Sequence, residues 1–306
     1  HRVHDSPPNS TWIARLADGS FISTIEADQG HVVTFRLSDD LAFDTVPLSG
    51  WRPRHPCHIA VSGDRALVSA YSSGEVAVID LGSQTIQSVF AFAPPSGERP
   101  MRQRASHPHF SIHWRGAWWV ADLGSDMIRC LGALNQNGGP IEALERRIVL
   151  PDGSGPRHLA RGTHELVCSA ELDSRLYTTW FESDTPRHAS VPTTTKAGEN
   201  APSHVEMIRP DLVCVGNRGA GSLALMRSGT QPELLREIVL SGPSPRHFRF
   251  FGNQVLVADD VAGHVEILYL TRALEVVQRD VVPVPGAAYI GPTTGGSEVG
   301  ELYEGN

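Results

Sequence analysis

The sequence predicts an all-β fold built from six copies of one block of about 25 residues. Each copy has an apolar run, a short polar turn and a second apolar run. Five copies carry a histidine in their opening segment, at spacings of 51, 49, 46 and 43 residues: His58, His109, His158, His204 and His247. A strand-rich repeat of about 47 residues is typical of propellers and solenoids.

The opening segments are related but not identical. Four copies open on Pro-x-His, beginning at Pro56, Pro156, Pro202 and Pro245. The fifth reads His107-Pro108-His109, and the sixth, near residues 10–12, has no histidine. A histidine that recurs in most copies is more typical of a structural hydrogen-bonding group than of a catalyst, because one site rarely needs five identical groups.

The apolar runs have the composition of β-strands. Residues 65–70 and 254–258 are rich in strand-forming side chains, and residues 75–79 and 264–268 alternate or are apolar throughout, as packed strands do. The turns between them contain Gly, Ser and Asp, and the 29 glycines and 22 prolines fit many short strands. No segment has a helical period of usable length, so we expect no long helix.

Repeat length predicts the number of blades. The last copy ends near Leu270, and residues 271–306 together with residues 1–10 have the length of one further period. A seventh blade made from both termini would close the ring and remove its exposed strand edges. We therefore expect a single domain over residues 1–306, a seven-bladed β-propeller closed by strands from both termini.

Composition excludes several classes of partner. The net charge of −8 argues against a general nucleic-acid binder, whose footprint would be basic. No apolar run approaches the ~18 residues of a membrane helix, and residues 1–10 are polar rather than signal-like. The spacing of the four cysteines matches no zinc motif, which favours buried reduced thiols. We expect a cytoplasmic protein with no membrane or nucleic-acid partner, and the sequence predicts no oligomeric state.

One residue per copy ends the first strand-like run, directly before the turn. These six residues are Glu26, Tyr71, Asp122, Glu171, Arg218 and Asp260, and all except Tyr71 are charged. In a ring of blades, equivalent positions share one radius and one height, so these side chains would converge around the axis. The alternative is that they only make hydrogen bonds and salt bridges between blades, and the pattern alone does not separate the two.

The opening segments also contain candidate binding groups. Arg157 and Arg246 each precede an opener histidine, and arginines near loops of an acidic protein favour a small anionic ligand. The alternative is that they are solvated surface arginines. His107, His109 and His113 suggest a metal site. This site is disfavoured because the three side chains would share a face only if the whole segment were extended and contained no turn.

Motifs of nucleophilic and nucleotide-binding enzymes are missing from the sequence. It contains no Gly-x-Ser-x-Gly elbow and no Gly-rich loop between a strand and a helix. An enzyme with this sequence would use acid–base chemistry, with arginines placing an anionic substrate.

Several segments, spread from about Ser10 to Ile290, resemble the seven-bladed lactonase family. Members of that family include propeller-type 6-phosphogluconolactonases and the fungal 3-carboxy-cis,cis-muconate lactonizing enzyme. The segments are Pro56-Cys57-His58, His107-Pro108-His109, Ala121-Asp122-Leu123-Gly124, Gly153-Ser154-Gly155-Pro156-Arg157-His158, Glu171-Leu172-Asp173-Ser174, Gly216-Asn217-Arg218-Gly219 and Pro245-Arg246-His247-Phe248.

The resemblance implies a set of site residues. In the family a His, two Arg and a Glu surround the channel mouth, and the matching motifs make the predicted catalytic residues His109, Arg157, Glu171 and Arg218. The predicted substrate-binding residues are Arg246, His247, His158, Asp122 and Tyr71. No cofactor and no metal are expected.

The resemblance also implies an activity, the hydrolysis of a sugar lactone, with 6-phosphogluconolactone of the pentose phosphate pathway as the leading substrate. Arg157 and Arg218 would hold the phosphate or the developing oxyanion, and either His109 or Glu171 would be the general base. The alternatives are a 3-carboxy-cis,cis-muconate cycloisomerase, a metal-dependent gluconolactonase-like propeller, and a non-catalytic binding platform. The last is disfavoured because the strands lack a Trp-Asp signature.

The chain departs from the family at its start. Family members usually begin with a strand that reads Tyr-x-Gly-Thr-Tyr-Thr, whereas here a similar string lies at residues 289–296. The ring would then be permuted, or its N-terminal strands lost and replaced by the C-terminal tail, or residues 282–291 would be the ordinary closing strand.

Overall fold

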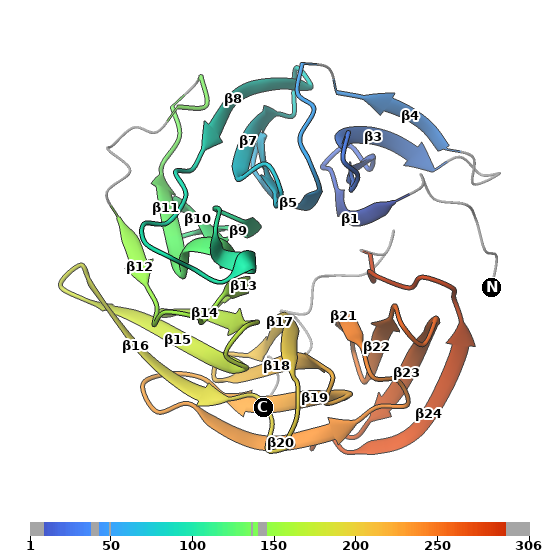
Figure 1. Ribbon diagram of the computed structural model, residues 1–306. Helices are drawn as coiled ribbons and strands as arrows, with labels where there is room; N and C mark the ends of the chain where they lie inside the picture. Colours follow the sequence, from blue (N-terminus) through green and yellow to red (C-terminus); the bar gives the residue numbers. More distant parts are fainter. Residues whose placement is uncertain (1–8, 38–42, 49, 136, 140–145, 292–306) are drawn as a thin grey trace. The chain divides into compact units, whose positions relative to one another are not determined.

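The computed structural model describes residues 9–37, 43–48, 50–135, 137–139 and 146–291. These residues form six four-stranded antiparallel sheets, and Figure 1 shows the strands of each sheet following one another in chain order. The chain divides into two compact units, one reaching Gly155 and the other spanning Pro156–Ile290, which we describe separately. The prediction of an all-β architecture is confirmed, whereas the single domain stays a prediction.

The first unit contains three of the six sheets. Their strands are β1 (Ser10–Arg15), β2 (Phe21–Ile25), β3 (His31–Leu37) and β4 (Phe43–Pro47), then β5 (Pro56–Ser62), β6 (Arg65–Ala70), β7 (Glu75–Asp80) and β8 (Thr85–Ala91), then β9 (Pro108–Trp114), β10 (Ala117–Asp122), β11 (Met127–Gly132) and β12 (Arg147–Val149). Two short 3-10 helices lie here, η1 (Met101–Gln103) and η2 (Leu123–Ser125). Within the described ranges, no helix has the length and apolarity needed to cross a membrane.

The second unit contains the other three sheets. Their strands are β13 (Pro156–Arg161), β14 (Glu165–Ala170), β15 (Arg175–Glu182) and β16 (Thr185–Pro192), then β17 (Ala201–Arg209), β18 (Leu212–Arg218), β19 (Ser222–Arg227) and β20 (Glu233–Val239), then β21 (Pro245–Phe251), β22 (Gln254–Asp259), β23 (His264–Leu270) and β24 (Val276–Pro283). Within each unit the first strands of neighbouring sheets contact one another: β1 with β5, β5 with β9, β13 with β17, and β17 with β21.

The core of each unit lies between neighbouring sheets. Leu67, Val76 and Val78 of one sheet pack against Trp118 and Val120 of the next. In the second unit, Phe248, Val257 and Leu268 pack against residues of the preceding sheet in the same way. Burial of each such side chain stabilises the fold by about 1.5–3 kcal/mol. Apolar packing between neighbouring sheets therefore holds the sheets of each unit together.

A β-bulge lies at the start of every first strand that the structure describes. In β5, β13 and β21 the hydrogen-bond register passes from the opening proline to the residue two positions on, which leaves Cys57, Arg157 and Arg246 outside the ladder. In β9 the register passes from Pro108 to Phe110 and leaves out His109. A bulge leaves its extra residue unpaired and turns the side chain in a new direction.

The bulge corrects one part of the repeat alignment. The prediction placed His109 in the same column as the other opener histidines. The register instead places Phe110 at the position of His58, because Phe110 pairs with Ala121 as His58 pairs with Ser69. His109 therefore occupies the position of Arg157 and Arg246.

The C-terminal part of the chain does not match the predicted seventh blade. Strand β24 (Val276–Pro283) pairs with β23, so it is the fourth strand of the sixth sheet. Residues 284–291 form no strand, so the alternative in which residues 282–291 are the ordinary closing strand is wrong beyond Pro283. Residues 1–8 and 292–306 lie outside the described residues. Closure by both termini, a permuted ring and the blade number of seven remain predictions.

Asp126 joins two loops in the first unit. It lies at the left-handed position after η2, with φ of 53°, and its buried carboxylate accepts hydrogen bonds from five groups. The donors are Gln103 Nε2 at 2.6 Å, Arg99 Nη1 at 2.7 Å, Gly155 N at 2.8 Å, Gly153 N at 2.9 Å and Ser154 Oγ at 3.1 Å. This one carboxylate therefore fixes the segments on both sides of β9–β12.

The four cysteines are free thiols. Cys130, Cys168 and Cys214 are buried, as predicted, and Cys57 is half-buried. Burial raises the pKa of the Cys168 and Cys214 thiols. These two side chains therefore act as small apolar groups rather than as nucleophiles.

Candidate active site

Three of the predicted catalytic side chains meet in the second unit. Arg157 is the bulge residue of β13, Glu171 directly follows β14, and Arg218 is the last residue of β18. The Arg157 guanidinium donates to Oε2 of Glu171, and Nη2 of Arg218 lies 2.8 Å from the same oxygen. Arg157 and Glu171 are both about 5% exposed, so the pair is nearly dry.

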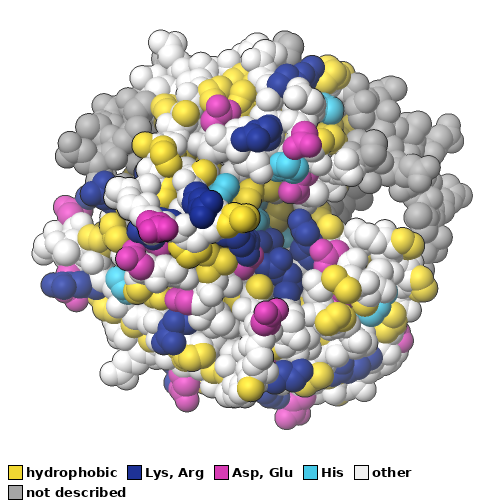
Figure 2. Space-filling model, in the orientation of Figure 1, with side chains coloured by type: hydrophobic (Ala, Val, Ile, Leu, Met, Phe, Trp, Pro, Cys, Tyr) yellow, Lys and Arg dark blue, Asp and Glu magenta, His cyan; other side chains and the backbone are white. Residues whose placement is uncertain are grey.

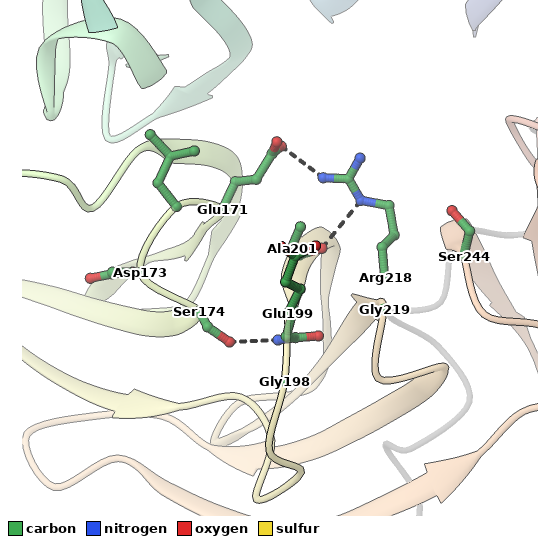
Figure 3. Close-up of a pocket in the computed structure, with 11 residues that line it drawn as sticks. Glu171, Asp173, Ser174, Gly198, Glu199, Ala201, Arg218, Gly219 and Ser244 are labelled. Atoms are coloured by element: carbon green, nitrogen blue, oxygen red, sulfur yellow. Dashed lines mark hydrogen bonds and ion pairs between the residues drawn. The ribbon is translucent and has the colours of Figure 1, made fainter. Parts of the chain in front are cut away.

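Local structure explains why these groups converge. Glu171 and Arg218 lie at the ends of the second strands of neighbouring sheets, next to the start of each first strand. Nε of Arg218 donates to the carbonyl of Ala201 at 3.2 Å, which holds the guanidinium plane toward Glu171. Figure 3 shows the Arg218 side chain between Glu171 and Ala201, joined to each by a dashed line.

A third arginine adds positive charge. Arg246, the bulge residue of β21, lies 3.1 Å from Oδ2 of Asp260, and Ser244 donates to Oδ1 of the same carboxylate at 2.7 Å. Burial and the neighbouring charges of Arg157 and Arg246 lower the pKa of Arg218 to about 10, although Glu171 opposes this. We call Arg157, Arg218 and Arg246 with Glu171 and Asp260 the arginine cluster.

The arginine cluster has one positive charge in excess, because three guanidinium groups face two carboxylates. Within the described residues, Nε of Arg157 is buried and has no hydrogen-bond partner. Figure 2 shows Lys and Arg side chains gathered with acidic ones on the face where β17 and β21 begin. Guanidinium groups held in this way bind carboxylate, phosphate or a developing oxyanion.

An open pocket of about 640 Å³ adjoins the arginine cluster, a volume typical of small-molecule sites. Its lining includes the polar or charged residues Glu171, Asp173, Ser174, Glu199, Asn200, Arg218 and Ser244. Burial raises the pKa of the Asp173 carboxyl group, whose Oδ2 accepts a hydrogen bond from the Tyr177 hydroxyl at 2.6 Å. The pocket therefore offers both donors and acceptors to a ligand.

Glu171 is poorly placed to act as a base. Two guanidinium groups contact the same carboxylate oxygen, and adjacent cations stabilise the charged form of a carboxyl group. A carboxylate stabilised in this way takes up a proton weakly. The geometry instead suits Glu171 to orient Arg157 and Arg218.

Two predicted substrate-binding histidines lie in the interior of the second unit rather than on the pocket lining. His158 and His247 are about 4% exposed. Nδ1 of His158 is 3.0 Å from Nδ1 of His204, whose ring stacks on His247 with centroids 4.0 Å apart. The backbone N–H of Ile290 donates to Nδ1 of His247 at 3.3 Å. These contacts support the expectation that the recurring histidines join neighbouring strands.

His204 gives the fold a specific pH dependence. Burial, assisted by Arg249 and Arg157, lowers the pKa of His204 to about 3. His204 therefore takes up a proton near pH 6.5 in the unfolded chain but stays neutral at that pH in the folded protein. Because the unfolded state binds the extra proton, the free energy of unfolding falls as the pH drops below 6.5. Between pH 7 and 5, the free energy of unfolding of His204→Gln should fall by about 2 kcal/mol less than that of the unaltered protein.

Urea unfolding at both pH values measures this difference. His55→Gln, whose parent side chain is 38% exposed, is the control for replacing a histidine near the surface. An unchanged pH dependence in His204→Gln would contradict the assignment.

The remaining predicted residues lie in the first unit. The Tyr71 ring stacks on His107 with centroids 4.4 Å apart and meets the edge of His109 at 5.6 Å. Asp122 is fully buried and accepts hydrogen bonds from Ser106 Oγ, the His107 backbone N–H and Arg129 Nε at 2.7–2.8 Å. Both Asp122 oxygens are therefore used within the fold, which favours a structural role over substrate binding.

The histidines proposed for a metal site have separate partners. Nδ1 of His107 donates to the carbonyl of Tyr71 at 2.9 Å, and Nδ1 of His113 is 3.1 Å from the hydroxyl of Ser62. No group of three or more potential metal ligands occurs in the part of the chain that the structure describes. The geometry of the described residues therefore does not support the metal-dependent alternative.

Some pocket residues were not predicted. Glu199 and Asn200 come from the turn before β17, which reads in the sequence as an ordinary surface loop. Asp260 was recognised as a column residue but not as the partner of Arg246. Arg157 and Arg246 occupy the same bulge position in two sheets of one unit. This equivalence was the signal that could have indicated that Arg246 also pairs with the carboxylate that follows the next strand.

Repeated four-stranded meanders with contacting first strands define an all-β propeller. A family model described as "Lactonase, 7-bladed beta-propeller" matches residues 2–290, and the chain belongs to this family. No curated protein matches the chain.

Solved structures show the same fold at low sequence identity. The periplasmic gluconolactonase of Pseudomonas aeruginosa is 19% identical with a TM-score of 0.83, over 94% of this chain and 89% of that one. A candidate 6-phosphogluconolactonase of Bacteroides fragilis is 19% identical with a TM-score of 0.81, over 93% and 87%. A Lactobacillus plantarum protein is 20% identical with a TM-score of 0.82, over 92% and 86%.

Proposed function

We propose that the protein is a lactone hydrolase whose arginine cluster binds the anionic parts of the substrate and of the transition state. The observation that carries the proposal is the buried Glu171 carboxylate, which holds Arg157 and Arg218 beside an open pocket. Membership of the lactonase family supports the reaction class. The excess positive charge of the cluster supports an anionic substrate.

The reaction needs a developing negative charge to be stabilised. A water molecule attacks the lactone carbonyl carbon, and the carbonyl oxygen becomes an oxyanion. The ring C–O bond then breaks, the ring oxygen leaves as a hydroxyl group after taking a proton, and the product is a hydroxy acid. Guanidinium groups that are fixed before the reaction stabilise the oxyanion without further reorganisation. Arg157 and Arg218 fill this role, and Glu171 orients them.

His109 is the proposed general base. It is the bulge residue of β9, the position that Arg157 and Arg246 hold in their own sheets. A neutral imidazole accepts a proton from water near neutral pH, and such help supplies about 10²–10⁴-fold in rate. We expect His109→Asn to lower kcat for lactone hydrolysis at least 100-fold. Wild-type activity in this variant would remove His109 from the mechanism.

The leading substrate is 6-phosphogluconolactone, which would place the protein in carbohydrate metabolism through the pentose phosphate pathway and in the cytoplasm. Arg246 would hold the phosphate while Arg157 and Arg218 act on the carbonyl oxygen. We propose no cofactor and no metal. Initial rates with 6-phosphogluconolactone and glucono-1,5-lactone, corrected for spontaneous hydrolysis, test this choice. A higher kcat/KM for the phosphorylated lactone is expected, and equal values would leave a lactonase without phosphate recognition.

Cycloisomerisation of 3-carboxy-cis,cis-muconate is the second candidate. Three guanidinium groups within one cluster suit a substrate with several carboxylates. Loss of the muconate absorbance on incubation with the protein would favour this reaction. Turnover of sugar lactones without muconate turnover would exclude it.

A further inference from the structure

A second charged group lies on β17 and β21, beyond Arg246 of the arginine cluster along β21. Glu206 of β17 and Arg249 of β21 both stand four residues after the opening proline of their strand. At this position the other proline-opened first strands have apolar residues: Ala60, Ile112 and Ala160. Because β17 and β21 contact each other, the acid and the guanidinium come from adjacent strands.

The contacts of Glu206 leave part of its carboxyl group unused. The backbone N–H of Phe250 hydrogen-bonds to this carboxyl group. Its Oε2 is buried, lies 4.0 Å from Nε2 of His204, and has no hydrogen-bond partner among the residues described. The side chain as a whole is 18% exposed, so it can still be reached from solvent.

Arg249 is close to Glu206 without forming a salt bridge to it within the described contacts. Its guanidinium donates a hydrogen bond to the Tyr289 hydroxyl, and its charge acts on both Glu206 and Tyr289. Arg249 and Tyr289 are half-buried. A half-buried guanidinium with one neutral partner and an incompletely bonded carboxyl group beside it can still bind an anion.

Glu206 is the group in this neighbourhood that changes charge near neutral pH. Burial raises the pKa of Glu206 to about 7, although Arg249 opposes the shift. His204 stays neutral because its pKa is lowered to about 3, and burial raises the pKa of the Cys214 thiol and of the Tyr289 hydroxyl. The ring of His247 stacks on that of His204. The charge of Arg157, a member of the arginine cluster, helps to lower the pKa of His204.

The charge of the group therefore depends on one proton. When Glu206 is ionised, its negative charge cancels the positive charge of Arg249, so an anion is only weakly attracted to the pair. With Glu206 protonated, Arg249 is uncompensated and the carboxyl group becomes a hydrogen-bond donor. A small carboxylate would then accept from Arg249 with one oxygen and from Glu206 with the other.

We propose that Glu206, Arg249 and Tyr289 form a second ligand site, which binds a small monocarboxylate together with one proton. This site goes beyond the proposed lactone hydrolysis and does not depend on it. A single negative charge matches the single uncompensated guanidinium, so a monocarboxylate is preferred to a dianionic phosphate.

Acetate is the probe, and isothermal titration calorimetry in two buffers of different ionisation enthalpy is the measurement. The protein used is Arg218→Gln, so that acetate at the arginine cluster does not mask the second site. Acetate should bind with uptake of about one proton at pH 8, and about tenfold more weakly at pH 8 than at pH 6, because the protonated fraction of Glu206 falls by that factor.

Two further substitutions assign the site. Glu206→Gln, made in the Arg218→Gln protein, keeps a donor without a titrating group, so binding should continue without proton uptake and with equal affinity at both pH values. Arg249→Met in the same protein should abolish binding, and Arg249→Lys, which keeps the charge, should weaken it at least tenfold.

The results that would overturn the proposal are specific. Acetate binding that disappears in Arg218→Gln but persists in Arg249→Met would assign the anion to the arginine cluster. Absence of binding to Arg218→Gln at both pH values, or binding without proton uptake at pH 8, would also refute the second site. None of these readouts depends on lactone turnover, so a failed lactonase assay leaves the test intact.

Discussion

Arg157→Gln should lower kcat/KM for lactone hydrolysis by about 10²–10³-fold, the loss expected when one donor to a developing oxyanion is removed. Arg157 donates to Glu171 from a nearly dry position, and Arg218 contacts the same carboxylate oxygen. The substitution removes one cation from the arginine cluster, so its excess positive charge disappears. Initial-rate kinetics over a range of lactone concentrations measure the effect.

Controls separate lost chemistry from lost structure. Arg187→Gln removes an exposed arginine of the same unit, paired at the surface with Glu182, and should leave kcat/KM unchanged. Arg157→Lys keeps the charge without the planar fork and should still lose at least tenfold. Circular dichroism and the unfolding temperature verify that each variant is folded. A folded Arg157→Gln protein with full activity would remove Arg157 from the mechanism.

Asp126→Ala should lower the free energy of unfolding by about 3–5 kcal/mol, because several buried donors would lose their acceptor at once. The carboxylate accepts hydrogen bonds from the loop around η1 and from residues 153–155. The free energy of unfolding of Asp126→Asn should lie between those of the unaltered protein and Asp126→Ala, because an amide keeps the shape of the side chain but replaces one acceptor oxygen by a donor. Urea unfolding of the three proteins measures the series.

The matched control is Asp80→Ala. Asp80 also accepts a backbone N–H and a hydroxyl, both from Ser83, but it does so at an exposed turn. Its replacement should leave stability close to that of the unaltered protein. An Asp126→Ala protein as stable as the Asp80→Ala protein would show that the buried hydrogen bonds of Asp126 do not hold the two loops.

The second and third strands of each sheet were predictable because burial gives them a simple pattern. Residues of β6 and β7 are apolar almost throughout, as strands packed on both faces must be. The fourth strands face solvent and lack that pattern, as in β24, where most side chains are exposed. For this reason residues 271–283 read as material for a seventh blade, although β24 completes the sixth sheet.

The candidate site was predictable only in part. The motif resemblance selected Arg157, Glu171 and Arg218, and the structure brings these three together. Arg157 and Arg218 contact the same oxygen of Glu171 because of how neighbouring sheets pack, and no local sequence pattern predicts this packing. The position of His109 depends on hydrogen-bond register, and a bulge of one residue leaves no mark in composition or periodicity. The pairing of Arg246 with Asp260 was hidden for the same reason.

The bulge also bears on how a repeated fold acquires new chemistry. The six described sheets share it, yet the residues left out of the ladder differ in chemistry, with hydroxyl, thiol, imidazole and guanidinium groups among them: Thr11, Cys57, His109, Arg157, Ser203 and Arg246. An exchange at this point alters the reactive group without moving the strand, whereas a deletion would turn every following side chain to the opposite face. Duplication of such a sheet therefore copies the scaffold together with one position at which selection can act independently.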